Sequence, residues 1–391
     1  MLLRHTWPPL LVACLSPFAW ADSFLMTRLQ GLPLFNGALK NGGVAPYGTL
    51  DLGVNYSQAG GKSTWQMQSG GEWTSKFGLA GRELLGGGWR AEFNLEAGFN
   101  ANDGTPQVAG APFNREAWLG LESPQWGALR LGRQLNAGLP LFVDPFGAVN
   151  TNSVYSWVGM GAVQTSRGVL PNADLGPGSA QLDSRAGGAV KWMSPRGQGF
   201  NVELLQAAEP GRRTPGSRGA MLAHLDGPLF LAASLNQSWQ PLPQALGTGA
   251  VRNDFYGLAA VYDTGRLVLS TSHTVTIPRR QQNGIARVYT AGAIVAEKRH
   301  VYRLSIVYRD TSGARDSDGR SISSAALGLM LGYDYMLSKR TGLYARAGSI
   351  RNLGGSTLVL NSQPLPTDAL GRPLSGIAPV SAAIGLYHNY F

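Results

Sequence analysis

The stretch GWRAEFNLEAGF, residues 88–99, decides the fold. Apolar and polar side chains alternate along it, with Trp89, Ala91, Phe93 and Leu95 in one set and Arg90, Glu92, Asn94 and Glu96 in the other. Successive side chains of a β-strand point to opposite faces. An apolar face opposite a charged one therefore predicts a strand that lies between an apolar phase and water.

The same alternation recurs along the chain, in residues 47–56, 300–308 and 325–336. Glycine is abundant, at 53 residues, as suits many strands joined by tight turns. After the N-terminus no stretch of 18 uncharged apolar residues occurs, so a membrane-spanning helix is not expected.

Short and long connectors alternate between these strands. The short ones begin near residues 83, 123, 194, 226, 263, 296 and 337, and the long ones cover about 58–70, 100–112, 135–183, 209–216, 240–251, 277–284, 311–320 and 352–376. Seven turns and eight loops join sixteen strands, provided that the weakly patterned residues 285–296 form one of them. The chain is therefore predicted to be all-β, a 16-stranded antiparallel transmembrane β-barrel. The alternative, a soluble β-sandwich, needs a second sheet over the apolar face and does not account for the alternating connectors.

The two ends of the chain carry signals of their own. Residues 1–21 have the pattern of a signal peptide, and cleavage after Ala21 would remove Cys14, the only cysteine. Lipidation at Cys14 is the competing interpretation. Residues 22–45 form an extension, either a short periplasmic helix or an insert in the lumen, and residues 46–391 form the barrel. The outward phase of the last strand ends at Tyr390, so the terminal Phe391 is one residue out of phase.

The net charge of the chain indicates which classes of ligand it favours. Lys and Arg total 33 against 23 Asp and Glu, which gives a net charge of +10 and favours anions. Nucleic-acid binding is not expected, because the basic residues form no run or binding motif. The sequence shows no zinc spacing or phosphate loop, and we expect no metal and no cofactor.

Four segments together resemble the general porins of the Gram-negative outer membrane, especially their betaproteobacterial branch. They are residues 75–99, 113–121, 129–134 and 333–348, and the resemblance runs from about residue 47 to residue 391. It implies a homotrimer of barrels, each with its own water-filled pore. The third long loop folds inward in that family, and an arginine-rich wall faces acidic groups on the loop. It also implies contact with outer-membrane lipids and lipopolysaccharide, and assembly by the barrel-assembly machinery through the last strand, which ends in Phe391.

The resemblance assigns roles to individual residues. Lys76, Arg115 and Arg185 match basic positions of the pore wall. The alternation adds further residues that face inward: Arg82, Arg90, Arg130, Lys191, Glu92 and Glu96. Arg133 has the opposite phase and resembles a subunit-contact arginine. Glu116 shares the phase of Trp118, which we take as outward, so both Arg133 and Glu116 are assigned to the trimer interface.

The long connector at residues 135–183 is the expected constriction loop. Its sequence VDPFGAV resembles the acidic–Pro–Phe–Gly turn of the family, which makes Asp144 the first candidate for the acidic group opposite the wall and Asp174 the second. The alternative for Asp144 is that it caps a turn.

The sequence thus predicts passive diffusion of small hydrophilic solutes, with a preference for anions. A substrate-specific channel for phosphate or organic acids shares the same scaffold and stays open as an alternative. A barrel enzyme would need a serine, a histidine and an orienting partner together. None of the five histidines lies in a motif that suggests a catalytic base; they are His5, His224, His273, His300 and His388.

Overall fold

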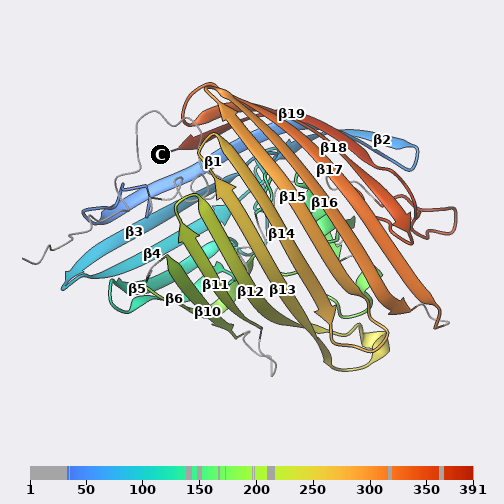
Figure 1. The fold of residues 1–391 in the computed structure, drawn as a ribbon, viewed down its shortest axis with the longest axis horizontal. Helices are drawn as coiled ribbons and strands as arrows, with labels where there is room; N and C mark the ends of the chain where they lie inside the picture. The colour runs from blue at the N-terminus through green and yellow to red at the C-terminus, as the bar shows by residue number, and fades with distance from the viewer. Residues whose placement is uncertain are drawn as a thin grey trace, which may run out of the picture.

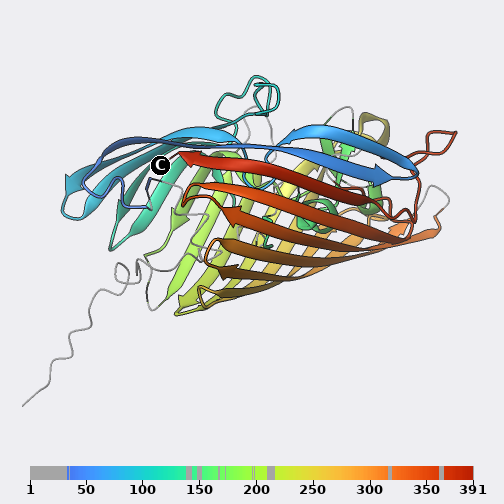
Figure 2. The same ribbon diagram turned by 90° about the horizontal axis from the view of Figure 1, so that it is seen from above.

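A single antiparallel sheet closes on itself to form the barrel (Figure 1). The computed structural model describes residues 33–34, 36–137, 143–147, 152–165, 168–171, 173–195, 197, 199–208, 216–315, 319–360 and 365–390. The first strand, β1, pairs with the last, β19, from Gly48 opposite Tyr390 to Gln58 opposite Val380. Figure 2 shows this closure as the blue strand lying beside the red one. Closure leaves no sheet edge with unpaired backbone groups, as a sheet in a bilayer requires.

The strands are joined in chain order. They are β1 Gly43–Ala59, β2 Lys62–Ser69, β3 Lys76–Gly86, β4 Trp89–Gly98, β5 Glu116–Ser123, β6 Gly127–Leu135, β9 Arg185–Met193, β10 Phe200–Ala207, β11 Ser217–Asp226, β12 Leu229–Pro241, β13 Ala250–Asp263, β14 Leu267–Pro278, β15 Ile285–Glu297, β16 His300–Arg315, β17 Ser321–Met336, β18 Thr341–Gly354 and β19 Val380–Tyr390. A separate hairpin, β7 Ala162–Thr165 and β8 Gly168–Pro171, lies in the loop between β6 and β9.

Two of these strands share one position in the barrel. The second half of β1 pairs with β2 and its first half pairs with β3, so β2 and β3 are one strand interrupted at residues 70–75. The seventeen strands of the main sheet in the described chain therefore fill sixteen positions, as the sequence predicts.

Three segments show where the sequence pattern predicts the strand boundaries correctly and where it does not. The weakly patterned residues 285–296 do form a strand, β15. The expected loop at 58–70 is wrong: β1 and β2 meet in a tight turn at Gly60 and Gly61, whose φ angles of 55° and 79° suit glycine. The expected loop at 311–320 is also too long, because β16 continues to Arg315. In both places the strands continue with mostly polar residues after the apolar alternation ends.

The two faces of the sheet differ as the alternation predicts. Outward side chains are apolar and exposed, as Leu119 at 61%, Leu131 at 53% and Leu258 at 58% illustrate. Inward side chains include many covered polar groups, among them Asn94, Asn236 and Ser305. Within the described residues, no helix is long and apolar enough to cross a membrane.

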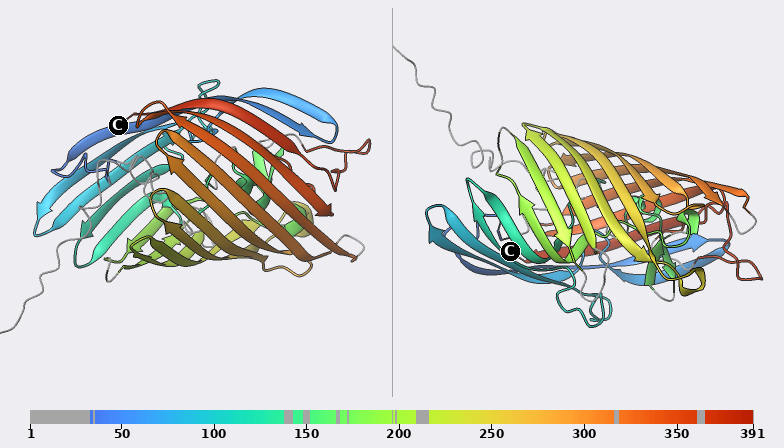
Figure 3. Two further views of the ribbon diagram at one scale, coloured as in Figure 1. Left: turned by 45° about the horizontal axis from the view of Figure 1, so that its top comes forward. Right: turned by 90° about the horizontal axis from the view of Figure 1, so that it is seen from below.

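The described parts of the loop between β6 and β9 lie inside the barrel, where its helical turns contact β15 to β17 (Figure 3). Its π-helical turn, Tyr155–Gly159, contacts β15, β16 and β17. Trp157 and Val158 are buried there with Val307 and Met330 of the barrel wall. A short 3-10 turn at Ala173–Leu175 also contacts β16 and β17, so the loop is fixed to one wall of the lumen.

The described part of the N-terminal extension also lies inside the barrel. Leu34 and Leu39 are buried against Tyr47, Ala80 and Trp118, all of which face inward. Residues 22–32 of this extension lie outside the described residues. The expectations for Cys14, Ala21 and Phe391 lie outside the described residues.

Candidate functional site

The inner wall formed by β3, β4, β5, β6 and β9 carries a cluster of charges around two glutamates. The first is Glu96 of β4, which is 2% exposed. Lys76 of β3 lies 3.4 Å from its carboxylate and Arg185 of β9 lies 3.7 Å from it. Arg115, just before β5, also donates a hydrogen bond to this carboxylate. One buried carboxylate thus holds together the three cations that the resemblance assigns to the pore wall.

The second glutamate, Glu92, precedes Glu96 on the same face of β4 and lies closer to the short-turn end. Arg82 lies 2.7 Å from its carboxylate, Arg90 3.2 Å and Arg130 3.8 Å. The Arg130 guanidinium also lies 4.0 Å from the centre of the Trp118 ring, where a cation–π contact stabilises it. We call the six cations around Glu92 and Glu96 the basic wall.

Glu116 does not lie where the sequence assignment put it. It is 8% exposed and accepts hydrogen bonds from the Asn94 amide at 3.0 Å and the Trp118 indole at 2.7 Å. Both partners face the lumen, so Glu116 faces inward and the outward assignment is wrong. The alternation misplaces Glu116 because it treats the large Trp118 ring as lipid-facing, whereas this ring packs under Arg130 in the lumen.

The remaining residues of this wall follow their predicted phase. Lys191 of β9 faces inward and lies 2.7 Å from the Glu203 carboxylate of β10. Arg133 of β6 lies opposite Ala117, in the outward phase of Leu129 and Leu131. Its guanidinium donates a 2.5 Å hydrogen bond to the Asn114 carbonyl, at the loop end of the barrel.

The two acidic residues proposed for the constriction, Asp144 and Asp174, bind the opposite wall. Asp144 is 2% exposed and accepts hydrogen bonds from the Phe146 backbone N–H at 3.0 Å, the Ser153 hydroxyl at 3.2 Å and the Ser305 hydroxyl of β16. These contacts are those of a turn cap that also docks the loop. Asp174 forms an ion pair with Arg309 of β16 at 2.9 Å.

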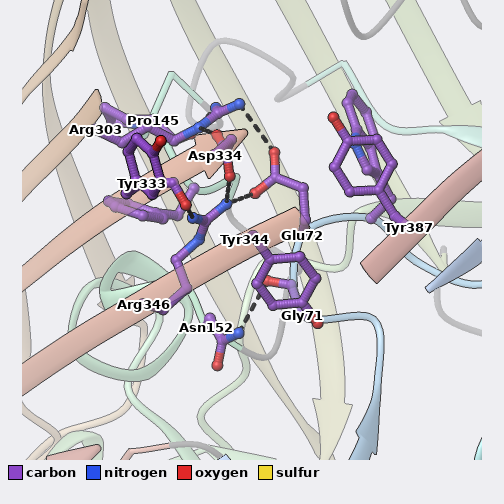
Figure 4. Close-up of polar contacts among 12 residues, drawn as sticks. Gly71, Glu72, Pro145, Asn152, Arg303, Tyr333, Asp334, Tyr344, Arg346 and Tyr387 are labelled. Atoms are coloured by element: carbon purple, nitrogen blue, oxygen red, sulfur yellow. Dashed lines mark hydrogen bonds and ion pairs between the residues drawn. The ribbon is translucent and has the colours of Figure 1, made fainter. Parts of the chain in front are cut away.

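A second charged cluster is not predicted from the sequence. Arg346 of β18 bonds Glu72 and lies 2.6 Å from Asp334, while Arg303 of β16 lies 3.0 Å from Glu72 and 2.7 Å from Asp334 (Figure 4). Glu72 belongs to residues 70–75, where the strand is interrupted. The alternation does place Arg303 on the inward face of its strand, whereas Tyr302 lies on the outward face. No sequence spacing, however, relates Glu72 to residues more than two hundred positions away.

This second cluster also joins the loop to the barrel. Arg303 donates a 2.8 Å hydrogen bond to the Pro145 carbonyl, and the Asn152 amide donates one of 3.0 Å to the Gly71 carbonyl (Figure 4). The Arg346 guanidinium lies 5.3 Å from the centre of the Phe146 ring. We call Glu72, Arg303, Asp334 and Arg346 the loop anchor.

The chemistry that these groups can perform is electrostatic. In the described residues, no group of three or more His, Cys, Asp or Glu side chains could hold a metal ion. Fixed guanidinium groups along an aqueous passage attract anions and orient polar solutes.

Comparisons with known proteins agree with this geometry. The family model of Gram-negative porins matches residues 10–355. Outer membrane porin protein 32 of Delftia acidovorans is 29% identical over 381 residues, covering 93% of this chain and 99% of its own. An outer membrane porin protein of Bordetella pertussis is 28% identical over 363 residues, covering 79% of this chain and 89% of its own.

A solved structure is similar over most of the chain. The anion-selective porin from Comamonas acidovorans has a TM-score of 0.72 and 25% identity, and the match covers 89% of this chain and 100% of that one. Family, relatives and fold agree with a barrel that is apolar outside and polar inside. The chain therefore belongs to the Gram-negative porins, which are channels of the outer membrane.

Proposed function

We propose that this porin conducts small hydrophilic solutes with a preference for anions. The basic wall carries the proposal: Lys76, Arg82, Arg90, Arg115, Arg130 and Arg185 gather on one side of the lumen. Among the described residues, these six cations contact Glu92, Glu96 and Glu122 directly, and Arg130 is linked to Glu116 through Trp118. The excess of charge on this wall is positive.

Most charged groups of the opposite wall are paired or covered. In the loop anchor, two arginines are matched by Glu72 and Asp334. Two carboxylates of the loop are engaged in docking, because Asp174 pairs with Arg309 and Asp144 is buried under hydroxyl and backbone donors. The field in the passage is then set by the basic wall, and at physiological salt it extends over about 8 Å. The solved anion-selective porin with the same fold supports this choice of ion.

The N-terminal extension is proposed to narrow the passage. Arg82 donates hydrogen bonds to the Leu34 carbonyl at 2.9 Å and to the Leu39 carbonyl at 3.2 Å. These contacts hold the extension on the basic wall near the end where the short turns lie. Residues 1–21 are proposed to be a signal peptide, cleaved after Ala21.

The finer partner assignments are proposals too. Porins of this type are expected to assemble as homotrimers, with Arg133 at a subunit contact. The last strand, ending in Phe391, is proposed to be the segment read by the barrel-assembly machinery. The chain offers both an outward arginine on β6 and an apolar final strand for these roles.

A liposome-swelling assay tests the proposed preference. Purified protein would be reconstituted, and swelling rates would be compared for an organic anion and an organic cation of matched size, each supplied with a small counterion that crosses the membrane freely. The proposal predicts faster entry of the anion. Equal rates, or a faster cation, would contradict it, and no swelling with any small solute would contradict the channel itself.

A further inference from the structure

Arg130 of β6 differs from its neighbours in the basic wall in how its charge is held. Arg82 donates a 2.8 Å hydrogen bond to Glu92, and Arg90 donates one of 2.5 Å to Glu122. The Arg130 guanidinium forms one ion pair, with Glu92 at 3.8 Å, and donates no hydrogen bond within the part of the chain that the structure describes. Its side chain is 15% exposed, so its N–H donors are free for a solute in the passage.

An aromatic ring sets the position of this arginine instead. The guanidinium carbon of Arg130 lies over the face of the Trp118 ring, 4.0 Å from the ring centre. The ring is itself fixed, because it is 5% exposed and its indole N–H donates a 2.7 Å hydrogen bond to Glu116. Glu116 also accepts a 3.0 Å hydrogen bond from the Asn94 amide. A buried carboxylate therefore holds the ring on which the guanidinium lies.

Two glycines bring the ring and the arginine together. In the register of β5 and β6, Trp118 lies opposite Gly132, and Arg130 lies opposite Gly120. The two large side chains are thus diagonal neighbours, a spacing that aromatic and long side chains can bridge. A Cβ atom on Gly120 would lie 2.8 Å from Cγ of Arg130, which is too close for a van der Waals contact. The arginine side chain therefore crosses the space that this glycine leaves free.

A guanidinium that lies on a ring has one face covered and its edge free. Its N–H donors lie in the guanidinium plane, where two of them match the two oxygens of a carboxylate or a phosphate. A chloride ion has the same sign of charge but no pair of oxygens for this edge. The arrangement is therefore suited to distinguishing oxyanions from halides.

We propose that Trp118 is a positioning residue for the selection of solutes, and that it holds Arg130 with its free edge toward carboxylates and phosphates that pass along the basic wall. The proposal rests on the proposed anion preference and adds the class of anion, oxyanions over halides. It also makes the selection depend on an uncharged side chain. The contact with the solute is brief, since a channel residue must bind a solute weakly enough to release it.

The test compares formate with chloride in single channels of the intact protein. A planar bilayer would separate potassium formate from KCl, and the reversal potential would give the permeability ratio of formate to chloride. Trp118→Leu removes the ring and leaves every charge in place. It is expected to lower this ratio about two- to fivefold, as the loss of one cation–π contact implies. Arg130→Lys keeps the charge but loses the planar edge, and it should lower the ratio as well.

Three further variants separate positioning from a merely structural role. Trp118→Phe keeps an aromatic face under the guanidinium and should retain most of the ratio. In the Arg130→Ala background, Trp118→Leu should lower the ratio no further, because a positioning residue acts only through the group that it positions. Trp126→Leu is the matched control, since this tryptophan is 72% exposed in the turn between β5 and β6, and it should leave the ratio unchanged. Stepwise conductance in each variant verifies that the barrels are folded.

Two kinds of outcome would overturn the proposal. The first is an unchanged ratio of formate to chloride in Trp118→Leu or in Arg130→Lys while the channel still prefers anions to potassium. That result would refute the positioning role and leave the proposed function intact. The second is a preference for potassium in the unchanged protein under a KCl gradient, which would refute both.

Discussion

Arg309 of β16 holds Asp174 of the inward loop in a two-point contact, with Nε 2.9 Å from Oδ2 and Nη2 3.1 Å from Oδ1. The two side chains are only 3% and 8% exposed. Asp174 also accepts a 2.7 Å hydrogen bond from the Thr311 hydroxyl. The loop carboxylate therefore fixes the position of the loop against β16.

Removing this contact should loosen the loop. Asp174→Asn leaves the covered Arg309 without its charged partner, at a cost of about 3–5 kcal/mol. We expect more frequent current fluctuations in single-channel recordings and faster cleavage of the loop by a protease. Asp368→Asn is the matched control, since Asp368 pairs with Arg372 in an exposed loop. Unchanged current noise in Asp174→Asn would show that the apolar contacts alone hold the loop.

The loop anchor should matter for the stability of the whole barrel. Arg346 is 4% exposed and contacts both Glu72 and Asp334, so Arg346→Ala leaves two covered carboxylates with Arg303 as their remaining cation in the cluster. We expect a loss of about 3–5 kcal/mol in the free energy of unfolding. Arg351→Ala, on the exposed side of the same strand, should change it by less than about 1 kcal/mol. Thermal unfolding followed by circular dichroism measures both, and equal stability of the two variants would contradict the role of the anchor.

The N-terminal extension should limit conductance. Leu39 is 2% exposed and lies against the inner wall, so Leu34→Ser/Leu39→Ser should release the extension and raise the single-channel conductance. Lys40→Ser changes an exposed neighbour and serves as the control. If conductance is the same in the double variant and the control, the extension does not narrow the passage.

Single cations of the basic wall can be removed without stranding a carboxylate. In Arg130→Ala, Glu92 keeps Arg82 and Arg90, and in Arg185→Ala, Glu96 keeps Lys76 and Arg115.

Each of these substitutions should lower the anion-to-cation permeability ratio by about twofold, the effect of one charge at about 8 Å in an aqueous passage. Arg266→Ala, outside the lumen, should leave the ratio unchanged. A ratio that does not fall in either wall variant would show that selectivity arises elsewhere, for example in the external loops.

The barrel can be predicted from the sequence because strands and turns are determined by residues that are close together in the chain. An apolar residue every second position determines which side chains face lipid, and turn residues mark the strand ends. The inward placement of Lys76, Glu92 and Arg130 follows from this alone. The rule that apolar side chains face lipid fails where large aromatic rings line the lumen. Trp118 is such a ring, and Glu116, which has the same phase as Trp118, is therefore assigned to the wrong face.

The partners of the charges could not be predicted. Whether Asp174 faces the basic wall or binds Arg309 depends on how a long loop folds back, and its sequence has no period that relates it to β16. The same holds for Glu72, which reaches Arg346 only because residues 70–75 interrupt a strand and enter the lumen. A contact between loop and wall residues that are far apart in the chain produces no repeating pattern in the sequence around either residue.

The reversal potential in a planar bilayer tests the central claim most directly. The purified protein would be inserted under a tenfold gradient of KCl, and the zero-current potential would be read from single channels. The account predicts stepwise conductance whose reversal lies toward the chloride equilibrium potential, and a smaller displacement in Arg130→Ala and Arg185→Ala. Reversal toward the potassium equilibrium potential would contradict it.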